Sequence, residues 1–228
     1  MPSLARRAVA EMFGTALFIF FGCAVVIMEP FPHARFGVFG IAATHAFALA
    51  LLISMTMGVS GGHLNPAVTI GLAAIRRISP LDAFVYVVSQ LAGALVGAAA
   101  VRTLMSYSVG SVVGFGTPML AEGLTITQAC TLEAIFAFML MSGVMATAVA
   151  RNAPKIAGFG IGLTLIPIIM VGGPLTGGVA NPARAFGPAV ITGNMTAQAV
   201  WWIGPIIGAV LAALLWNYVL LGRDEAAA

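Results

Sequence analysis

The sequence predicts an all-α integral membrane protein with six transmembrane helices and two re-entrant half-helices, arranged as an inverted repeat. Three observations support this fold class. The 228 residues are 61% hydrophobic and only 7% charged, with a mean hydropathy of +1.06, which leaves too few charged side chains to solvate a globule. Apolar stretches long enough to span a bilayer recur along the chain. One short motif occurs twice, between spans.

The apolar stretches define the membrane-spanning helices. Their lengths predict spans at about 8–28, 36–58, 81–105, 125–149, 156–174 and 199–221. Because the second motif follows the fifth span as the first follows the second span, we expect one half-helix at about 66–76 and another at about 182–191.

The chain is predicted to form a single transmembrane domain, 1–228, built from two related halves. The repeats cover about 1–108 and 122–228, and the connection 106–124, rich in Gly and Ser, joins them. Each half has three spans and one half-helix. Because three is odd, the second half is inserted upside down relative to the first, which is a known way to build a transport site at the midplane.

The repeated motif is a glycine pair, a short spacer and Asn-Pro-Ala, in Ser60–Thr69 and in Thr176–Ala185. Asn is a strong helix N-cap and Pro is favoured at the first helical position, so each copy predicts the start of a helix. A lone Asn-Pro-Ala would indicate no more than a capped helix, but two copies in opposed halves indicate a functional pair. The motif residues are Asn65, Pro66, Ala67, Asn181, Pro182 and Ala183.

Two opposed half-helices predict a pore. A half-helix of about ten residues is about 15 Å long, so two placed end to end cover the hydrocarbon thickness of about 30 Å. Asn65 and Asn181 then meet near the midplane, where irregular backbone is tolerated only inside protein or along a water-filled path. Each helix N-terminus carries about half a positive charge, which repels cations and orients water. The sequence therefore predicts a passive channel for water and small neutral solutes that excludes protons and ions.

On these motifs, on Ala10-Glu-Met-Phe-Gly-Thr15 and on Asn181-Pro-Ala-Arg184, the chain resembles the aquaporin family, the major intrinsic proteins, over nearly its whole length. The resemblance implies an aquaporin-like fold with one pore per subunit, assembled as a homotetramer. It also implies a narrow selectivity filter. Counting from the two Asn residues places that filter at His45, Ile169, Gly178 and Arg184.

The implied filter departs from that of water-only members, which pair a Phe on the second span with a His on the fifth. The set His45, Ile169, Gly178 and Arg184 resembles that of some plant vacuolar-membrane members, whose filters accompany passage of ammonia, urea and peroxide as well as water. Glycerol-conducting members typically have Asp after the filter Arg, where this chain has Ala185. We therefore expect a water channel that also passes small neutral solutes. The alternative is a channel mainly for glycerol, ammonia, urea or neutral metalloid hydroxides.

Several of these residues have a plainer interpretation. Arg184 could anchor the chain at the interface, although a charge buried in a bundle usually marks function. His45 could be a packing histidine between spans. His63 could be a simple loop residue, whereas the resemblance places it at the inner pore mouth.

Glu11 and Glu133 occupy matching positions in the two halves, on the first and fourth spans. Buried carboxylates can relay protons. Here a structural role is favoured, in which each accepts hydrogen bonds from backbone N–H groups of the loop before a half-helix.

The sequence argues against other classes of function. It contains no Ser-His-Asp set, no cysteine cluster and no phosphate-binding glycine loop, so we expect neither an enzyme nor a bound metal or cofactor. The basic residues form no continuous face for nucleic acid. A secondary transporter remains the main rival and would need ion ligands in its broken helices. A purely structural membrane protein would not explain two opposed half-helices.

The basic residues also predict an orientation in the lipid bilayer. The positive-inside rule places the side richer in Lys and Arg in the cytoplasm. Arg35 and Arg102 lie on the opposite side. We expect both termini to be cytoplasmic, and a bacterial inner membrane as the location. The residues on the expected cytoplasmic side are Arg6, Arg7, Arg76, Arg77, Arg151, Lys155 and Arg223.

Overall fold

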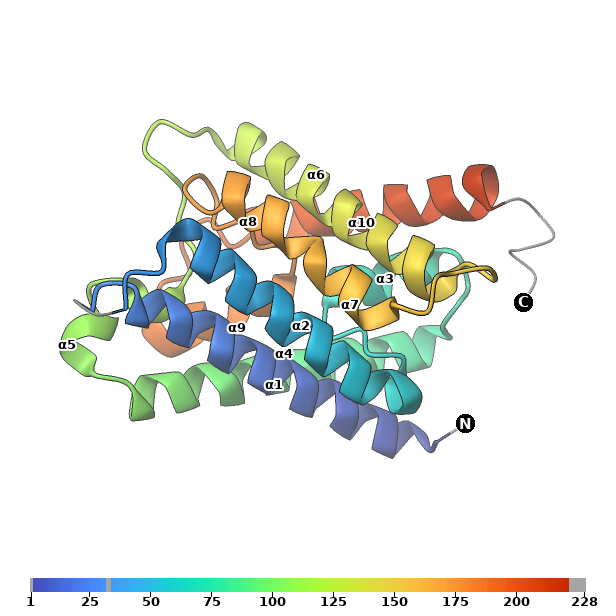
Figure 1. The fold of residues 1–228 in the computed structure, drawn as a ribbon, viewed down its shortest axis with the longest axis horizontal. Coiled ribbons are helices and arrows are strands. Elements are labelled where there is room, and N and C mark those ends of the chain that lie inside the picture. The colour runs from blue at the N-terminus through green and yellow to red at the C-terminus, as the bar shows by residue number, and fades with distance from the viewer. Residues whose placement is uncertain (1, 32–33, 222–228) are drawn as a thin grey trace.

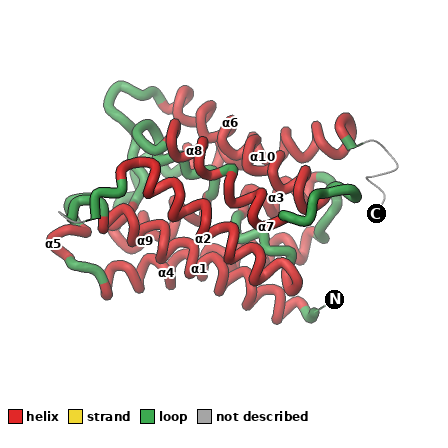
Figure 2. Tube along the Cα trace, in the orientation of Figure 1, coloured by secondary structure: helices red, strands yellow, loops and turns green. Residues whose placement is uncertain are grey.

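The computed structural model describes residues 2–31 and 34–221, which form helices joined by loops (Figure 2). Arg223 lies outside the described residues. The first half contains α1 (Leu4–Met28), α2 (Gly37–Ser60), α3 (Pro66–Ala74) and α4 (Pro80–Leu104). The second half contains α6 (Ile126–Val144), α7 (Ala157–Leu163), α8 (Leu165–Gly172), α9 (Pro182–Thr192) and α10 (Val200–Leu215). Single π-helical turns extend α6 and α10, at Met145–Val149 and Trp216–Leu220.

Five of the predicted spans are helices long and apolar enough to cross a membrane. The fifth predicted span is shorter, Ala157–Gly172, and is interrupted between α7 and α8 at Thr164. Pro167 explains the interruption, because it has no N–H to donate to the carbonyl group one turn earlier. At the interruption, the Thr164 hydroxyl donates to the carbonyl of Ile161, at 2.6 Å.

Two further details differ from the sequence prediction. The first helix begins at Leu4 rather than near residue 8, because the Ser3 hydroxyl accepts a hydrogen bond from the Arg6 N–H and caps it. The connection 106–124, in which the sequence predicts no helix, contains α5 (Tyr107–Gly110) and a 3₁₀ turn at Gly114–Gly116.

The helices pack in matching pairs in the two halves (Figure 1). α1 packs along α4, and α6 packs along α10, while α2 meets α7 and α8 between the halves. Each half-helix packs on the last span of the other half, α3 on α10 and α9 on α4. The halves therefore interlock. α1 begins and α10 ends at one end of the bundle, which we call the terminus end; the connection 106–124 lies at the other, the loop end (Figure 1).

Close helix contacts depend on glycines at matching positions. Gly93 of α4 lies against the carbonyl of Met12, and Gly208 of α10 lies against the carbonyl of Ala134, so neither position has room for a Cβ atom. Met12 and Ala134 directly follow Glu11 and Glu133. Small residues let backbones approach closely in a membrane, where tight packing drives helix association.

This contact predicts the effect of a Gly208→Val substitution. Overpacking should lower the free energy of unfolding by about 1–3 kcal/mol or more. The matched control is Gly58→Val in α2, where a Cβ would meet nothing within 4 Å. Thermal unfolding in detergent, followed by tryptophan fluorescence, measures both variants. Equal melting temperatures would contradict the close contact.

Candidate functional site

Both Asn-Pro-Ala motifs form capped helix N-termini. The Asn65 Oδ1 accepts a hydrogen bond from the Ala67 N–H at 2.8 Å, and the Asn181 Oδ1 accepts one from the Ala183 N–H at 3.0 Å. Pro66 and Pro182 occupy the first turns, where a missing N–H costs nothing. Each motif thus begins a short helix, α3 or α9.

The two caps are joined to each other. The Asn65 amide nitrogen donates to the carbonyl of Ala180 at 2.9 Å, and the Asn181 amide nitrogen donates to the carbonyl of Leu64 at 3.0 Å. Leu64 and Ala180, the residues before the two asparagines, both have φ of 49°, a left-handed conformation that turns their carbonyls toward the opposite loop. Each amide has a second N–H. The half-helices therefore meet N-terminus to N-terminus, and among the described residues the second N–H of each amide has no recorded partner.

Glu11 holds the loop before α3. Its carboxylate accepts hydrogen bonds from the backbone N–H groups of His63, at 3.0 Å, and Leu64, at 2.7 Å. The Ser60 hydroxyl and the Gln90 amide also donate to it, at 2.6 and 2.8 Å. Glu11 is completely buried. Its four hydrogen-bond donors all belong to the loop and the neighbouring helices, as a structural role requires.

Glu133 repeats this arrangement before α9. It accepts from the backbone N–H groups of Val179, at 3.0 Å, and Ala180, at 2.7 Å, and from the Thr176 hydroxyl at 2.6 Å. The indole N–H of Trp201 donates to the carbonyl of Thr176 at 3.0 Å. Like Glu11, Glu133 is completely buried.

Two vestibules enter the bundle from opposite ends, and the two asparagines line one of them. The terminus-side vestibule has a volume of about 320 Å³, and His63, Arg77, Asn65 and Asn181 are among its lining residues. The loop-side vestibule has a volume of about 530 Å³. Three residues of the predicted filter line it, namely His45, Ile169 and Arg184.

Gly178, the fourth predicted filter residue, does not line the loop-side vestibule; its neighbour Gly177 does. A Cβ on Gly178 would lie 2.7 Å from the carbonyl oxygen of Ile168 and 3.1 Å from the Cα of Ile169. Gly178 therefore packs directly against the backbone of α8, beside the vestibule. Its φ of 56° also favours glycine.

His45 is both packed and at the vestibule. Its Nδ1 lies 2.9 Å from the carbonyl oxygen of Ile41. A carbonyl can only accept, so Nδ1 carries the proton and Nε2 is the acceptor of the neutral ring. A Cβ on Gly22 of α1 would lie 2.7 Å from Nε2, and the Phe18 ring meets the imidazole edge-on at 6.0 Å. Both sequence interpretations of His45 are thus compatible with its position.

Sequence reasoning missed part of the site. The Arg184 Nη1 donates to the carbonyl of Gly116 at 2.6 Å, and Gly116 and Thr117 line the loop-side vestibule. The connection 106–124 was expected only to join the halves, and no motif within it marks these two residues. Arg77 lines the terminus-side vestibule, whereas the sequence marks it only as one of the basic residues that set the orientation in the bilayer. Among the described residues, no group of three His, Cys, Asp or Glu side chains could hold a metal ion.

The buried carboxylate predicts a large effect of Glu133→Ala. Two loop N–H groups would lose their partner, at a cost of about 1–3 kcal/mol each. The yield of folded protein and its melting temperature should fall, and Glu133→Gln, which keeps an accepting oxygen, should fall less. Glu122→Ala, on an exposed loop, is the control. Unchanged stability of Glu133→Ala would contradict the structural role.

Comparison with known proteins identifies the family. The chain matches the family model described as Major intrinsic protein over residues 1–216. It is 39% identical over 231 residues to Aquaporin TIP4-1 of Arabidopsis thaliana, covering 98% of this chain and 90% of the relative. Aquaporin TIP2-1 of the same plant is 36% identical over 228 residues, covering 96% and 89%.

The fold also matches a solved structure, the X-ray structure of the aquaglyceroporin from Plasmodium falciparum. The TM-score is 0.85 at 23% identity, and the match covers 96% of this chain and 97% of that chain. This likeness confirms the predicted six-span, two-half-helix fold, with the fifth span interrupted. With the family model matching all but the C-terminal residues and plant relatives well above 30% identity, this chain belongs to the family of major intrinsic proteins.

Proposed function

We propose that this protein is a passive channel for water and small neutral solutes that excludes protons and ions. One observation carries this function: two capped helix N-termini meet end to end between two vestibules, with Asn65 and Asn181 at the junction. The relatives named aquaporins support the same function. A structural membrane protein would have no use for this junction.

Electrostatics explain the exclusion of cations. Each half-helix contributes about half a positive charge at the junction, and Arg184 adds a full charge in the loop-side vestibule. Among the described residues, neither vestibule is lined by Asp or Glu. The second N–H of each Asn amide can donate to the oxygen of a passing water. A water oriented in this way by both amides cannot accept from its neighbours, which breaks a proton wire.

For the selectivity filter we propose His45, Ile169, Gly178 and Arg184. Ile169 is aliphatic and Gly178 has no side chain, so half of the set offers no polar or aromatic constriction. A filter with so few constricting side chains favours passage of small neutral solutes as well as water. The alternative, a channel mainly for glycerol, ammonia, urea or neutral metalloid hydroxides, follows if Arg184 leans away from the axis.

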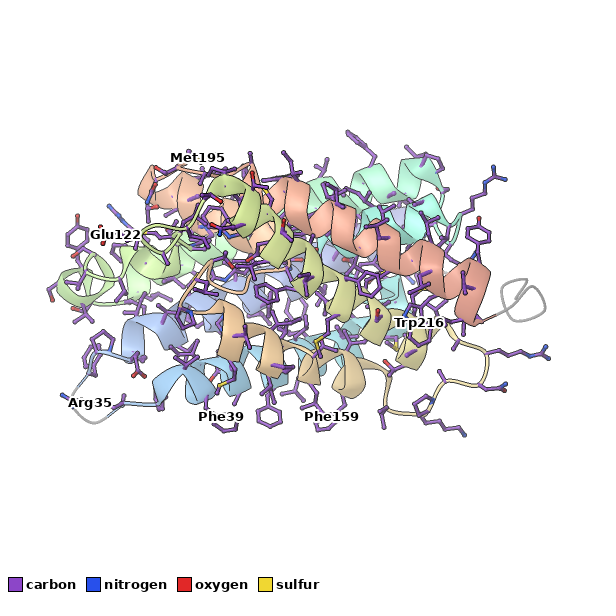
Figure 3. The ribbon with its side chains drawn as sticks, turned by 90° about the horizontal axis from the view of Figure 1, so that it is seen from above. Arg35, Phe39, Glu122, Phe159, Met195 and Trp216 are labelled. Atoms are coloured by element: carbon purple, nitrogen blue, oxygen red, sulfur yellow. The ribbon has the colours of Figure 1, made fainter. Side chains whose placement is uncertain are left out.

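The orientation proposed for the bilayer follows the basic residues. Arg7, Arg77 and Arg151 lie toward the terminus end, and Arg35 and Arg102 toward the loop end, so the positive-inside rule supports cytoplasmic termini. The relatives quoted above are plant proteins and give no support to the bacterial inner membrane expected from the sequence. Phe39 of α2 and Phe159 of α7 project from the bundle on one side, where lipid or a neighbouring subunit of the expected homotetramer would cover them (Figure 3).

Stopped-flow light scattering on proteoliposomes tests the function. Water gradients and inward glycerol, urea and ammonia gradients are compared with empty liposomes. We expect fast water flux with a low activation energy, and solute flux that stays linear in concentration. Saturable, gradient-coupled uptake would favour a transporter instead. Absence of any flux above empty liposomes would contradict the channel.

The filter is tested by substitutions of opposite size at His45. His45→Phe should narrow the path and lower urea permeability more than water permeability. We expect the urea-to-water permeability ratio to fall about tenfold, the discrimination by size that a close-fitting pocket provides. His45→Ala should raise the same ratio. The same proteoliposome assay measures both variants. Equal ratios in the two variants would remove His45 from the filter.

A further inference from the structure

The connection 106–124 contacts the proposed filter through its backbone. The Gly116 carbonyl accepts the hydrogen bond from the Arg184 Nη1, and Arg184 is only 6% exposed. Gly116 packs directly against α1. A Cβ atom on Gly116 would lie 2.8 Å from the Cα of Cys23, and the φ of Gly116 is 78°. The direction of the Arg184 guanidinium therefore depends on where this stretch of loop backbone sits.

The residue before Gly116 needs support in its conformation. Phe115 has φ of 49°, a left-handed conformation that is unusual for a bulky residue. Its side chain is 4% exposed and its ring covers Gly110, where a Cβ would lie 2.5 Å from the ring. Contacts made by the Phe115 ring must therefore offset the energetic cost of its left-handed backbone conformation.

Arg102 supplies one such contact from the last turn of α4. Its guanidinium carbon lies 4.9 Å from the centroid of the Phe115 ring and 5.1 Å from that of Tyr107, and the two ring centroids are 5.7 Å apart. A cation this close to two aromatic rings is attracted to both. We call Arg102, Tyr107 and Phe115 the aromatic latch.

We infer, on the basis of the proposed function, that Arg102 is a positioning residue for selectivity. It holds Phe115, Phe115 presents the Gly116 carbonyl, and that carbonyl fixes Arg184. Arg102 does not line the loop-side vestibule and acts only through the loop. Without the latch, the loop relaxes, Arg184 loses its acceptor, and its guanidinium swings away from the direction set by Gly116. Solutes larger than water then pass more easily.

The experiment uses Arg102→Met, which removes the charge and keeps the length of the side chain. Arg102→Lys keeps a cation for the rings, and Arg35→Met is the control, an exposed arginine at the same end of the bundle (Figure 3). In proteoliposomes, we expect Arg102→Met to raise the urea-to-water permeability ratio about threefold or more, as loss of a contact of this kind allows. Arg102→Lys should restore most of the ratio, and Arg35→Met should leave it unchanged.

A second readout follows the loop without using flux. Cys23 is completely buried beneath Gly116, so a loosened loop should expose its thiol. In a Cys130→Ser background, which removes the other cysteine, a maleimide should label Cys23 faster in Arg102→Met than in the parent or in Arg35→Met. A melting temperature lowered without change in ratio or labelling would show that Arg102 only stabilises the fold, and would overturn the inference.

The two proposals fail in different ways. If the parent protein conducts no water above empty liposomes, the proposed function fails, while the labelling comparison still reports on the latch. If the parent conducts water and Arg102→Met leaves both the permeability ratio and Cys23 labelling unchanged, the latch has no role in positioning Arg184.

Discussion

The junction of the two half-helices depends on how backbone N–H groups are satisfied deep inside a membrane protein. The loops before α3 and α9 leave the helical ladder inside the bundle, at the depth expected for the bilayer midplane, where lipid offers no hydrogen-bond partner. Glu11 and Glu133 provide that partner, each accepting from two consecutive N–H groups. Because a charged acceptor binds more strongly than a neutral one, two carboxylates are enough to hold both loops in the turn that aims the half-helices at one another.

The loops so held then secure the two halves to each other. The Asn65 and Asn181 amides each donate across to the opposite loop, and each half-helix rests on the last span of the other half. Neither motif can reach its final geometry until the other half is in place. The two halves therefore depend on each other for the geometry of the junction.

We propose that the selectivity of the pore comes from where the two copies differ. Three residues after the asparagine, the first copy has Val68, which lines the terminus-side vestibule, and the second has Arg184, which lines the loop-side vestibule. Arg184 is thus the charged side chain that distinguishes the two motifs, and it lies on the loop side of the junction. The connection 106–124 has no counterpart across the repeat, and it is this segment that accepts the hydrogen bond from Arg184.

The sequence by itself determined the helices, the two capped motifs and the matching carboxylates, because hydropathy, Asn-Pro caps and internal repetition are local patterns. It could not reveal the interruption at Thr164 from hydropathy alone, nor the contact of Gly116 with Arg184. Tertiary structure decided that contact. It also decided the position of His45 between α1 and the loop-side vestibule, and the hydrogen bond that each of the two asparagine amides donates to the opposite loop. The physical reason is that these contacts join residues far apart in the chain. The Gly116 contact and the contacts of the two asparagine amides also use backbone carbonyls, which every residue possesses and which leave no mark in the sequence.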